Sequence, residues 1–233
     1  MIPITIEYKS KKKRTVYFPT FAEMTVKQYL IITTSNNDKE AFKKITGVDA
    51  DIELTPLLPI ISNLDNSKTP SCIYIGRKKI KIAQDIGKLS FDQKLNAQKK
   101  LSEIQKEVNK NRYLFMPDLL SIYLEVPKKT IEKCNFNYLL PVFEHYFLLL
   151  LKIIERDVTT LNSKHTADEI AAGVKRLSKF GEFSSIDYMA GGDPLKYDDI
   201  LKLPYDVVYY KLLYRKEMND YEKRLSEILK NKK

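Results

Sequence analysis

The sequence predicts an α+β protein that is mainly α-helical, with two small β-hairpins in its N-terminal part and a long C-terminal helix. Two short stretches before residue 83 alternate apolar and polar residues, as half-buried strands do. Most of the chain after residue 90 repeats its apolar residues at helical spacing. The 233 residues are 43% hydrophobic, enough for a sizeable core, and seven Gly and ten Pro are too few for a low-complexity chain.

Alternation of apolar and polar residues predicts where the two hairpins lie in the sequence. The isoleucines of the first seven residues point to one side of a strand, and the pattern resumes at residues 15–18. Basic residues at 9–14 form the tip between these two strands. The second hairpin covers residues 72–82 and turns at Gly76 and Arg77.

Capping residues and apolar spacing predict helices along the rest of the chain. Thr25 and Ser90 are expected N-caps, Gly47 suits a left-handed helix end, and Thr166 with Glu169 forms a capping box. The expected helices are residues 26–32, 38–45, 57–64, 90–110, 117–126, 137–159, 166–180, 193–203 and 205–230. We divide the chain into a hairpin-bearing α+β part, residues 1–88, and a helical part, residues 89–233, that ends in a long amphipathic helix.

Neither a secretory signal nor a membrane span is expected. The lysines near the N-terminus follow its apolar residues, which reverses the order of a signal sequence. The most hydrophobic stretch, residues 138–154, contains Pro141, Glu144 and Lys152. A membrane span needs about 20 mostly apolar residues. We therefore predict a buried core helix here and no membrane contact.

The sequence lacks the residue patterns of catalytic, metal and cofactor sites. Its two cysteines have no CxxC spacing and its two histidines no HExxH motif. Neither a glycine-rich phosphate loop nor a G-x-S-x-G serine motif is present. Asp118, Glu125 and Lys128 resemble a nuclease pattern, but the lysine stands one position late and the stretch has a helical period. We expect Asp118 to cap a helix, and we predict no enzymatic activity, no metal and no cofactor.

Basic residues form the candidate site for anions. Forty Lys and Arg against thirty Asp and Glu give a net charge of +10, which favours contact with nucleic acid or acidic surfaces. The clusters are almost all lysine and lack the aromatic and planar groups that read bases. Non-specific DNA contact, an acidic protein surface and a merely solvated surface therefore stay open. The candidate residues are Lys11, Lys12, Lys13, Arg14, Arg77, Lys78 and Lys79.

An apolar seam runs along the last helix, which would extend about 39 Å at about 1.5 Å per residue. The residues of this C-terminal seam follow one another at steps of 3, 4, 4, 3, 4 and 3, the spacing of a helix that packs lengthwise on another helix. Packing across the chain's own bundle is favoured because tyrosine suits the edge of a core, and contact with a partner is the alternative. The C-terminal seam comprises Val207, Tyr210, Tyr214, Met218, Tyr221, Leu225 and Ile228.

Several short segments resemble those of known phage proteins. In the C-terminal third, these are FGEF at residues 180–183, DYMAGGDP at 187–194 and LPY at 203–205, leading into a long helix rich in Tyr, Lys and Glu. Near the N-terminus, MTVKQYL at 24–30 is followed by ITGVD at 45–49. These segments resemble structural and assembly proteins of tailed bacteriophages, including crAss-like phages of Bacteroides-type hosts. The likeness to tail and baseplate assembly chaperones is looser.

The resemblance implies a non-enzymatic structural component of the virion, in the neck, tail or baseplate. Such a protein would be assembled in the host cytoplasm and would contact other virion proteins in a symmetric oligomeric assembly. Its C-terminal helix and hairpins would be contact surfaces, and the basic hairpins would face DNA or acidic neighbours. The alternatives are a transient tail or baseplate assembly chaperone and a basic, nucleic-acid-binding phage accessory protein.

Overall fold

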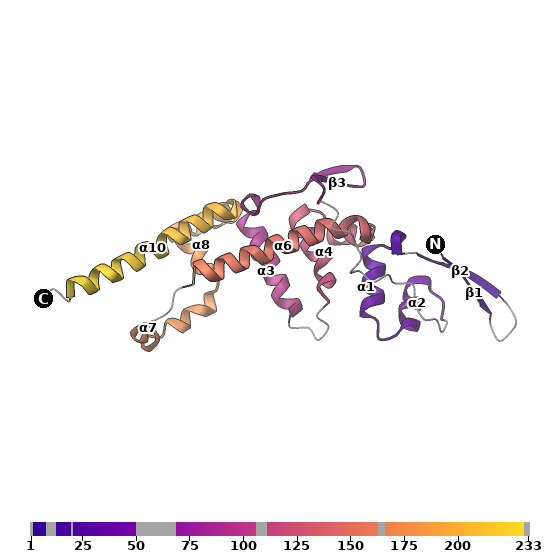
Figure 1. The fold of residues 1–233 in the computed structure, drawn as a ribbon, viewed down its shortest axis with the longest axis horizontal. Helices are drawn as coiled ribbons and strands as arrows, with labels where there is room; N and C mark the ends of the chain where they lie inside the picture. Colours follow the sequence, from indigo (N-terminus) through magenta and orange to yellow (C-terminus); the bar gives the residue numbers. More distant parts are fainter. Residues whose placement is uncertain are drawn as a thin grey trace. The chain divides into compact units, whose positions relative to one another are not determined.

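The computed structural model describes residues 2–7, 13–19, 21–49, 69–105, 111–162 and 166–230 (Figure 1). These residues are mainly helical, with two antiparallel hairpins in the N-terminal part. Figure 1 shows α10 (Tyr205–Lys230) as the long yellow helix that leads to the C-terminus. The predicted fold class is therefore confirmed.

Both hairpins pair as the alternation predicts. Strand β1 (Ile2–Glu7) lies antiparallel to β2 (Lys13–Phe18), and β3 (Cys72–Ile75) lies antiparallel to β4 (Lys78–Lys81). Gly76 begins the turn of the second hairpin with a φ of 60°, a left-handed conformation that glycine adopts without strain. The middle of the first basic tip, residues 8–12, lies outside the described residues.

Most helices begin at the predicted caps. Thr25 and Ser90 each accept a hydrogen bond from the backbone N–H three residues on, and Gln28 and Gln93 complete the two capping boxes. The helix predicted at residues 57–64 lies outside the described residues. The helices before α10 are η1 (Phe21–Glu23), α1 (Val26–Thr34), α2 (Asp38–Thr46), η4 (Ile86–Lys88), α3 (Phe91–Gln105), η5 (Arg112–Phe115), α4 (Met116–Leu124), α5 (Lys128–Lys133), α6 (Phe136–Thr160), α7 (Ala167–Ala171), η6 (Val174–Phe180), α8 (Phe183–Ala190), η7 (Pro194–Lys196) and α9 (Tyr197–Lys202).

One predicted helix is wrong in its extent. The expected helix at residues 166–180 does start at the Thr166 capping box, but α7 ends at Ala171. Gly173 follows with a φ of 86°, and the chain continues as the 3₁₀ helix η6. The left-handed glycine breaks the α-helical hydrogen-bond series, which local spacing of apolar residues does not reveal.

The chain forms two compact units, and each is discontinuous in sequence. Unit 1 comprises Met1–Ile82 and Lys99–Phe147, and unit 2 comprises Ala83–Gln98 and Leu148–Lys233. Helices α3 and α6 therefore each contribute residues to both units. The sequence-based division into contiguous parts at residues 88 and 89 stays a prediction.

Unit 1 has an aromatic core. The Tyr29 ring stacks on Phe136 at 3.9 Å between ring centres and meets Tyr113 edge-on at 5.7 Å. Phe18 stacks on Phe42, which ties β2 to α2. Burial raises the pKa of Tyr29 to about 12, so its hydroxyl stays protonated in the core.

Helix α6 runs through both units. By length and composition it is the one helix of the described residues that would be able to cross a membrane. Leu139, Val142 and Phe143 of its first half, and Leu150 and Ile153 of its second, are nevertheless buried against the protein itself. The burial of these side chains agrees with the predicted core helix.

Candidate interaction surface

The first turn of α10 is held by a backbone clamp inside unit 2. The Phe91 N–H donates to the Leu203 carbonyl at 2.9 Å, and the Tyr205 N–H donates to the Leu89 carbonyl at 2.7 Å. Pro204 lies opposite Ser90 in this short antiparallel bridge. The approach is close enough that a Cβ at Gly87 would collide with the Asp206 carboxylate. The clamp thus holds the first turn of α10 in place within unit 2.

A buried polar cluster secures the same turn. The Tyr205 hydroxyl donates to Asp157 Oδ2 at 2.5 Å, and Lys94 Nζ lies 3.1 Å from the same oxygen. Tyr205 is 1% exposed and Lys94 3%. Burial, followed by the hydrogen bond to Asp157, raises the pKa of Tyr205 above its ordinary value. We call Lys94, Asp157 and Tyr205 the Lys94 cluster.

Further contacts anchor the next turns of α10 along one face. The Arg156 guanidinium lies 3.7 Å from the Tyr209 ring centre, and its Nη1 is 2.9 Å from Asp206 Oδ1. The Tyr209 hydroxyl donates to Thr160 at 3.1 Å. Two turns on, the Arg215 guanidinium stacks over Tyr188 at 3.7 Å. These groups come from α6 and α8, so α10 has one packed face within unit 2.

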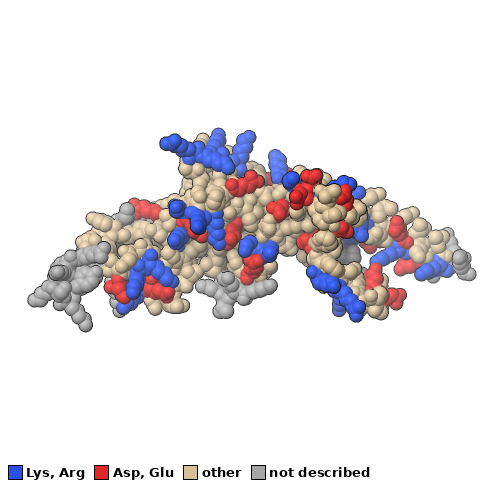
Figure 2. All heavy atoms as spheres, turned by 180° about the vertical axis from the view of Figure 1, so that it is seen from behind, with Lys and Arg blue, Asp and Glu red and all other residues tan. Residues whose placement is uncertain are grey.

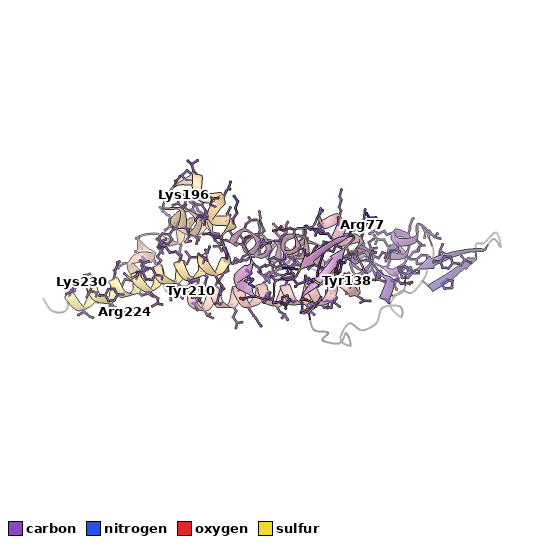
Figure 3. The ribbon with its side chains drawn as sticks, turned by 90° about the horizontal axis from the view of Figure 1, so that it is seen from above. Arg77, Tyr138, Lys196, Tyr210, Arg224 and Lys230 are labelled. Atoms are coloured by element: carbon purple, nitrogen blue, oxygen red, sulfur yellow. The ribbon has the colours of Figure 1, made fainter. Side chains whose placement is uncertain are left out.

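The C-terminal seam lies on a different face of α10 and is exposed. Exposure of its seven side chains ranges from 37% at Met218 to 67% at Tyr210. The buried residues of α10 are Tyr205, Val208 and Tyr209, none of which belongs to the seam. Tyr210, Arg224 and Lys230 mark the course of the helix in Figure 3. Within the described part of unit 2, the seam therefore does not pack on the chain's own helices as the favoured arrangement expects.

The outer part of α10 is exposed on every side. All residues from 221 to 230 are exposed. Lys223 makes an exposed ion pair at 2.7 Å with Glu169 of α7, and such a pair holds a helix weakly. The seam therefore continues past the anchored turns onto a helix end that offers its apolar side chains to solvent.

The predicted anion-binding residues are only partly placed. Arg77, Lys78 and Lys79 are exposed at the turn of β3–β4, and Figure 2 shows Lys and Arg gathered there at the top of the view. Lys13 and Arg14 lie in β2, and Lys11 and Lys12 fall outside the described residues. The two hairpins form separate two-stranded sheets, so the five described residues of this set do not belong to one sheet.

Two of the nuclease-like residues, Asp118 and Lys128, form an ion pair with each other. Lys128 Nζ lies 2.8 Å from Asp118 Oδ2, so the lysine neutralises the carboxylate directly. Asp118 sits in the first turn of α4 and is not its cap, because the helix begins at Met116 with Phe115 at the cap position. That corrects the expected role of Asp118. Among the residues described, no group of three His, Cys, Asp or Glu is placed to hold a metal ion.

A polar cavity that the sequence did not reveal adjoins the Lys94 cluster. Its volume is about 390 Å³, and its lining includes Gln98, Glu182, Ser185 and Arg215. Lys94 Nζ also lies 3.7 Å from a Glu182 carboxylate oxygen, so charges of both signs meet there. The lining residues come from α3, α6, α8, α10 and the residues next to α6 and α8, segments far apart in sequence, and no local motif marks them.

The exposed C-terminal seam is the candidate interaction surface, and the basic turn of β3–β4 is the second exposed feature. Each lies within a single short segment of the chain, so its residues follow from local sequence. Comparisons of the chain with protein-family models, with curated proteins and with solved structures gave no match.

Proposed function

We propose that the protein is a non-enzymatic structural component of a tailed bacteriophage virion and acts through protein–protein contacts of its C-terminal seam. The observation that carries this proposal is the exposure of all seven seam side chains on a helix whose other face is anchored. The resemblance of residues 180–205 to phage structural proteins supplies the setting, in the neck, tail or baseplate.

Burial of the seam side chains against a partner would be favourable in free energy. Full burial of one Leu, Ile, Val or Met side chain contributes about 1.5–3 kcal/mol, and the seam includes Val207, Met218, Leu225 and Ile228. Tyrosine and methionine are also enriched at the centres of protein interfaces. Because the base of α10 is already ordered, binding there would lose little conformational entropy. A helix of similar length on the partner would bury the whole seam.

Mass spectrometry of purified virions tests the setting. We expect the protein in the mature particle at a stoichiometry set by the symmetry of the neck, tail or baseplate. Presence during assembly and absence from the finished particle would instead support the transient assembly chaperone. Absence from both would contradict the proposal.

A matched pair of variants tests the surface. Leu225→Ser removes an exposed leucine of the seam, and Leu195→Ser removes a leucine of η7 that is 89% exposed and lies outside it. Particle assembly should fail or slow with the first variant and proceed with the second. If both variants assemble particles equally well, or equally poorly, the seam is not the contact surface.

A nucleic-acid-binding accessory protein is the second candidate, favoured by the three consecutive exposed cations Arg77, Lys78 and Lys79. It predicts binding of generic duplex DNA that weakens steeply with salt, with a slope of about −0.9 per phosphate contacted. Lys78→Glu with Lys79→Glu would abolish that binding. DNA binding that survives this double change would contradict a role for the β3–β4 turn.

A further inference from the structure

We infer that the C-terminal seam binds the C-terminal seam of a second copy of this chain, with the two α10 helices antiparallel. The inference rests on the proposed function, because it names the partner of the same surface. Three features of α10 carry it: a seven-residue repeat, the charges that flank this repeat, and the exposure of both.

The apolar repeat has the period of a two-helix coiled coil. Val207, Tyr214, Tyr221 and Ile228 recur every seven residues, and Met218 and Leu225 form the second apolar column. In heptad terms the first set occupies d positions and the second occupies a positions. Lys211 occupies the a position before Met218, and Tyr210 lies beside it at a g position. A heptad repeat of this kind turns one continuous stripe toward a partner helix.

The flanks of the repeat carry charges in a self-complementary order. One flank holds Arg215 and Glu222 at e positions, and the other holds Glu217 and Arg224 at g positions. Each flank therefore has one cation and one anion, seven residues apart. Such flanking charges determine partner choice and orientation in coiled coils.

An antiparallel pair places opposite charges together on both flanks. When Met218 packs against Tyr221 of the second copy, Arg215 faces Glu222 of that copy, and Glu217 faces its Arg224. The two-fold symmetry of the pair repeats each contact. Every flanking charge then meets its opposite.

A parallel pair would bring like charges together. In that arrangement each g residue faces the e residue five positions later on the other helix. Glu217 would then face Glu222 of the second copy, twice by symmetry. The flanking charges therefore select the antiparallel arrangement.

The flanking groups are available for these contacts. Within the described part of the chain, Glu217, Glu222 and Arg224 make no ion pair. Arg215 lies flat on the Tyr188 ring at 3.7 Å, and a stacked guanidinium still presents N–H donors along its edge. Residues 221–230 are exposed, so the second helix can approach the outer half of α10 freely.

The pairing spans residues 211–228, about 27 Å of helix at about 1.5 Å per residue. One helix contributes fewer residues than the roughly 20–30 per side of a standard interface. We therefore expect reversible association with a Kd in the micromolar range. Repetition of the contact in a larger assembly would strengthen it through avidity.

Charge reversal on one flank separates the two orientations. Sedimentation equilibrium of the full-length protein should show a monomer–dimer equilibrium, and Glu217→Arg and Arg224→Glu should each weaken the dimer about tenfold. An equimolar mixture of these two variants should regain dimerisation, since the arginine introduced into one chain then faces the glutamate introduced into the other. In a parallel pair, Glu217→Arg would instead strengthen the dimer because it removes the like-charge contact.

Disulfide cross-linking reads the orientation directly, in a background where Cys72 and Cys134 are replaced by serine. Ile228→Cys and Lys211→Cys, mixed, should form a cross-linked dimer, whereas Ile228→Cys alone should not. Cross-linking of Ile228→Cys alone would overturn the antiparallel arrangement. A protein that stays monomeric at all concentrations would overturn the inference entirely.

The two proposals fail in different ways. If the protein is monomeric but Leu225→Ser still blocks particle assembly, the seam binds another virion protein, and only the inference fails. If it dimerises as described but is absent from virions and from their assembly, the dimer stands and the proposed function fails.

Discussion

The two faces of α10 carry similar residues in opposite environments. Tyr205 and Tyr209 are buried and donate hydrogen bonds to Asp157 and Thr160, whereas Tyr210 and Tyr214 are 67% and 61% exposed. A phenol buries well where its hydroxyl finds an acceptor. Those acceptors lie on α6 and reach only one face of α10. Neighbouring polar groups, more than the apolar repeat, therefore determine which tyrosines are buried.

Truncation should produce the largest contrast between the faces. A chain ending at Pro204 loses the buried side chains of Tyr205, Val208 and Tyr209, each worth about 1.5–3 kcal/mol when fully buried. We expect unit 2 to lose several kcal/mol of unfolding free energy, measured by urea denaturation. A chain ending at Asn219 keeps the packed face and should stay within about 1 kcal/mol of the full-length protein. Equal losses from the two truncations would contradict the comparison.

The second largest loss of unfolding free energy is expected when one charge is removed from the Lys94 cluster. Asp157→Ala leaves the ammonium of Lys94 buried without its closest carboxylate, and breaking a buried pair in this way costs about 3–5 kcal/mol. The double change Lys94→Met with Asp157→Leu should recover much of that loss, because it removes both charges and keeps apolar volume. A thermal or urea unfolding series measures both. If the single and double variants are equally unstable, the cluster is not an electrostatic pair.

A smaller effect is expected from the Tyr205 hydroxyl, and it should depend on pH. The folded protein holds this proton more tightly than the unfolded chain, because burial and Asp157 raise the pKa of Tyr205. The hydroxyl's contribution is therefore complete below about pH 10 and is lost as the pH rises above that value. Tyr205→Phe should cost about 1 kcal/mol at neutral pH and show a weaker alkaline loss of unfolding free energy than the wild type. Tyr210→Phe, on the exposed face, should follow the wild type throughout.

Substitution on the seam should affect stability least. Tyr214 is 61% exposed, so Tyr214→Ser should change the unfolding free energy by no more than about 0.5 kcal/mol. The same change should weaken self-association, which light scattering over a range of concentrations measures. A large loss of stability in the monomer would show that the seam also serves the fold of unit 2.

Local chemistry made much of the fold predictable. Thr25, Ser90 and Thr166 identified helix starts because a capping side chain bonds to a backbone group three residues away. Gly76 marked the turn of the second hairpin because glycine adopts a left-handed conformation without strain. The helix predicted through Gly173 was wrong, because apolar spacing did not reveal that this glycine takes a left-handed conformation.

The candidate site was predictable in its residues but not in its environment. Sequence spacing defined the seven residues of the C-terminal seam but did not reveal that all seven are exposed in the described part of unit 2. It gave no sign of the Lys94 cluster, because Lys94, Asp157 and Tyr205 come from three helices. Buried polar contacts of this kind form between segments that share no sequence pattern.

The sequence by itself determined that residues 205–230 form one long helix and which of its residues repeat every seven positions, because both properties arise from the local order of residues. Only the tertiary structure decided which face of α10 is packed. That choice depends on Arg156, Asp157 and Thr160, which lie 48 to 50 residues from the α10 side chains they bind. Hydrogen bonds and ion pairs over such separations exist only once the helices have come together.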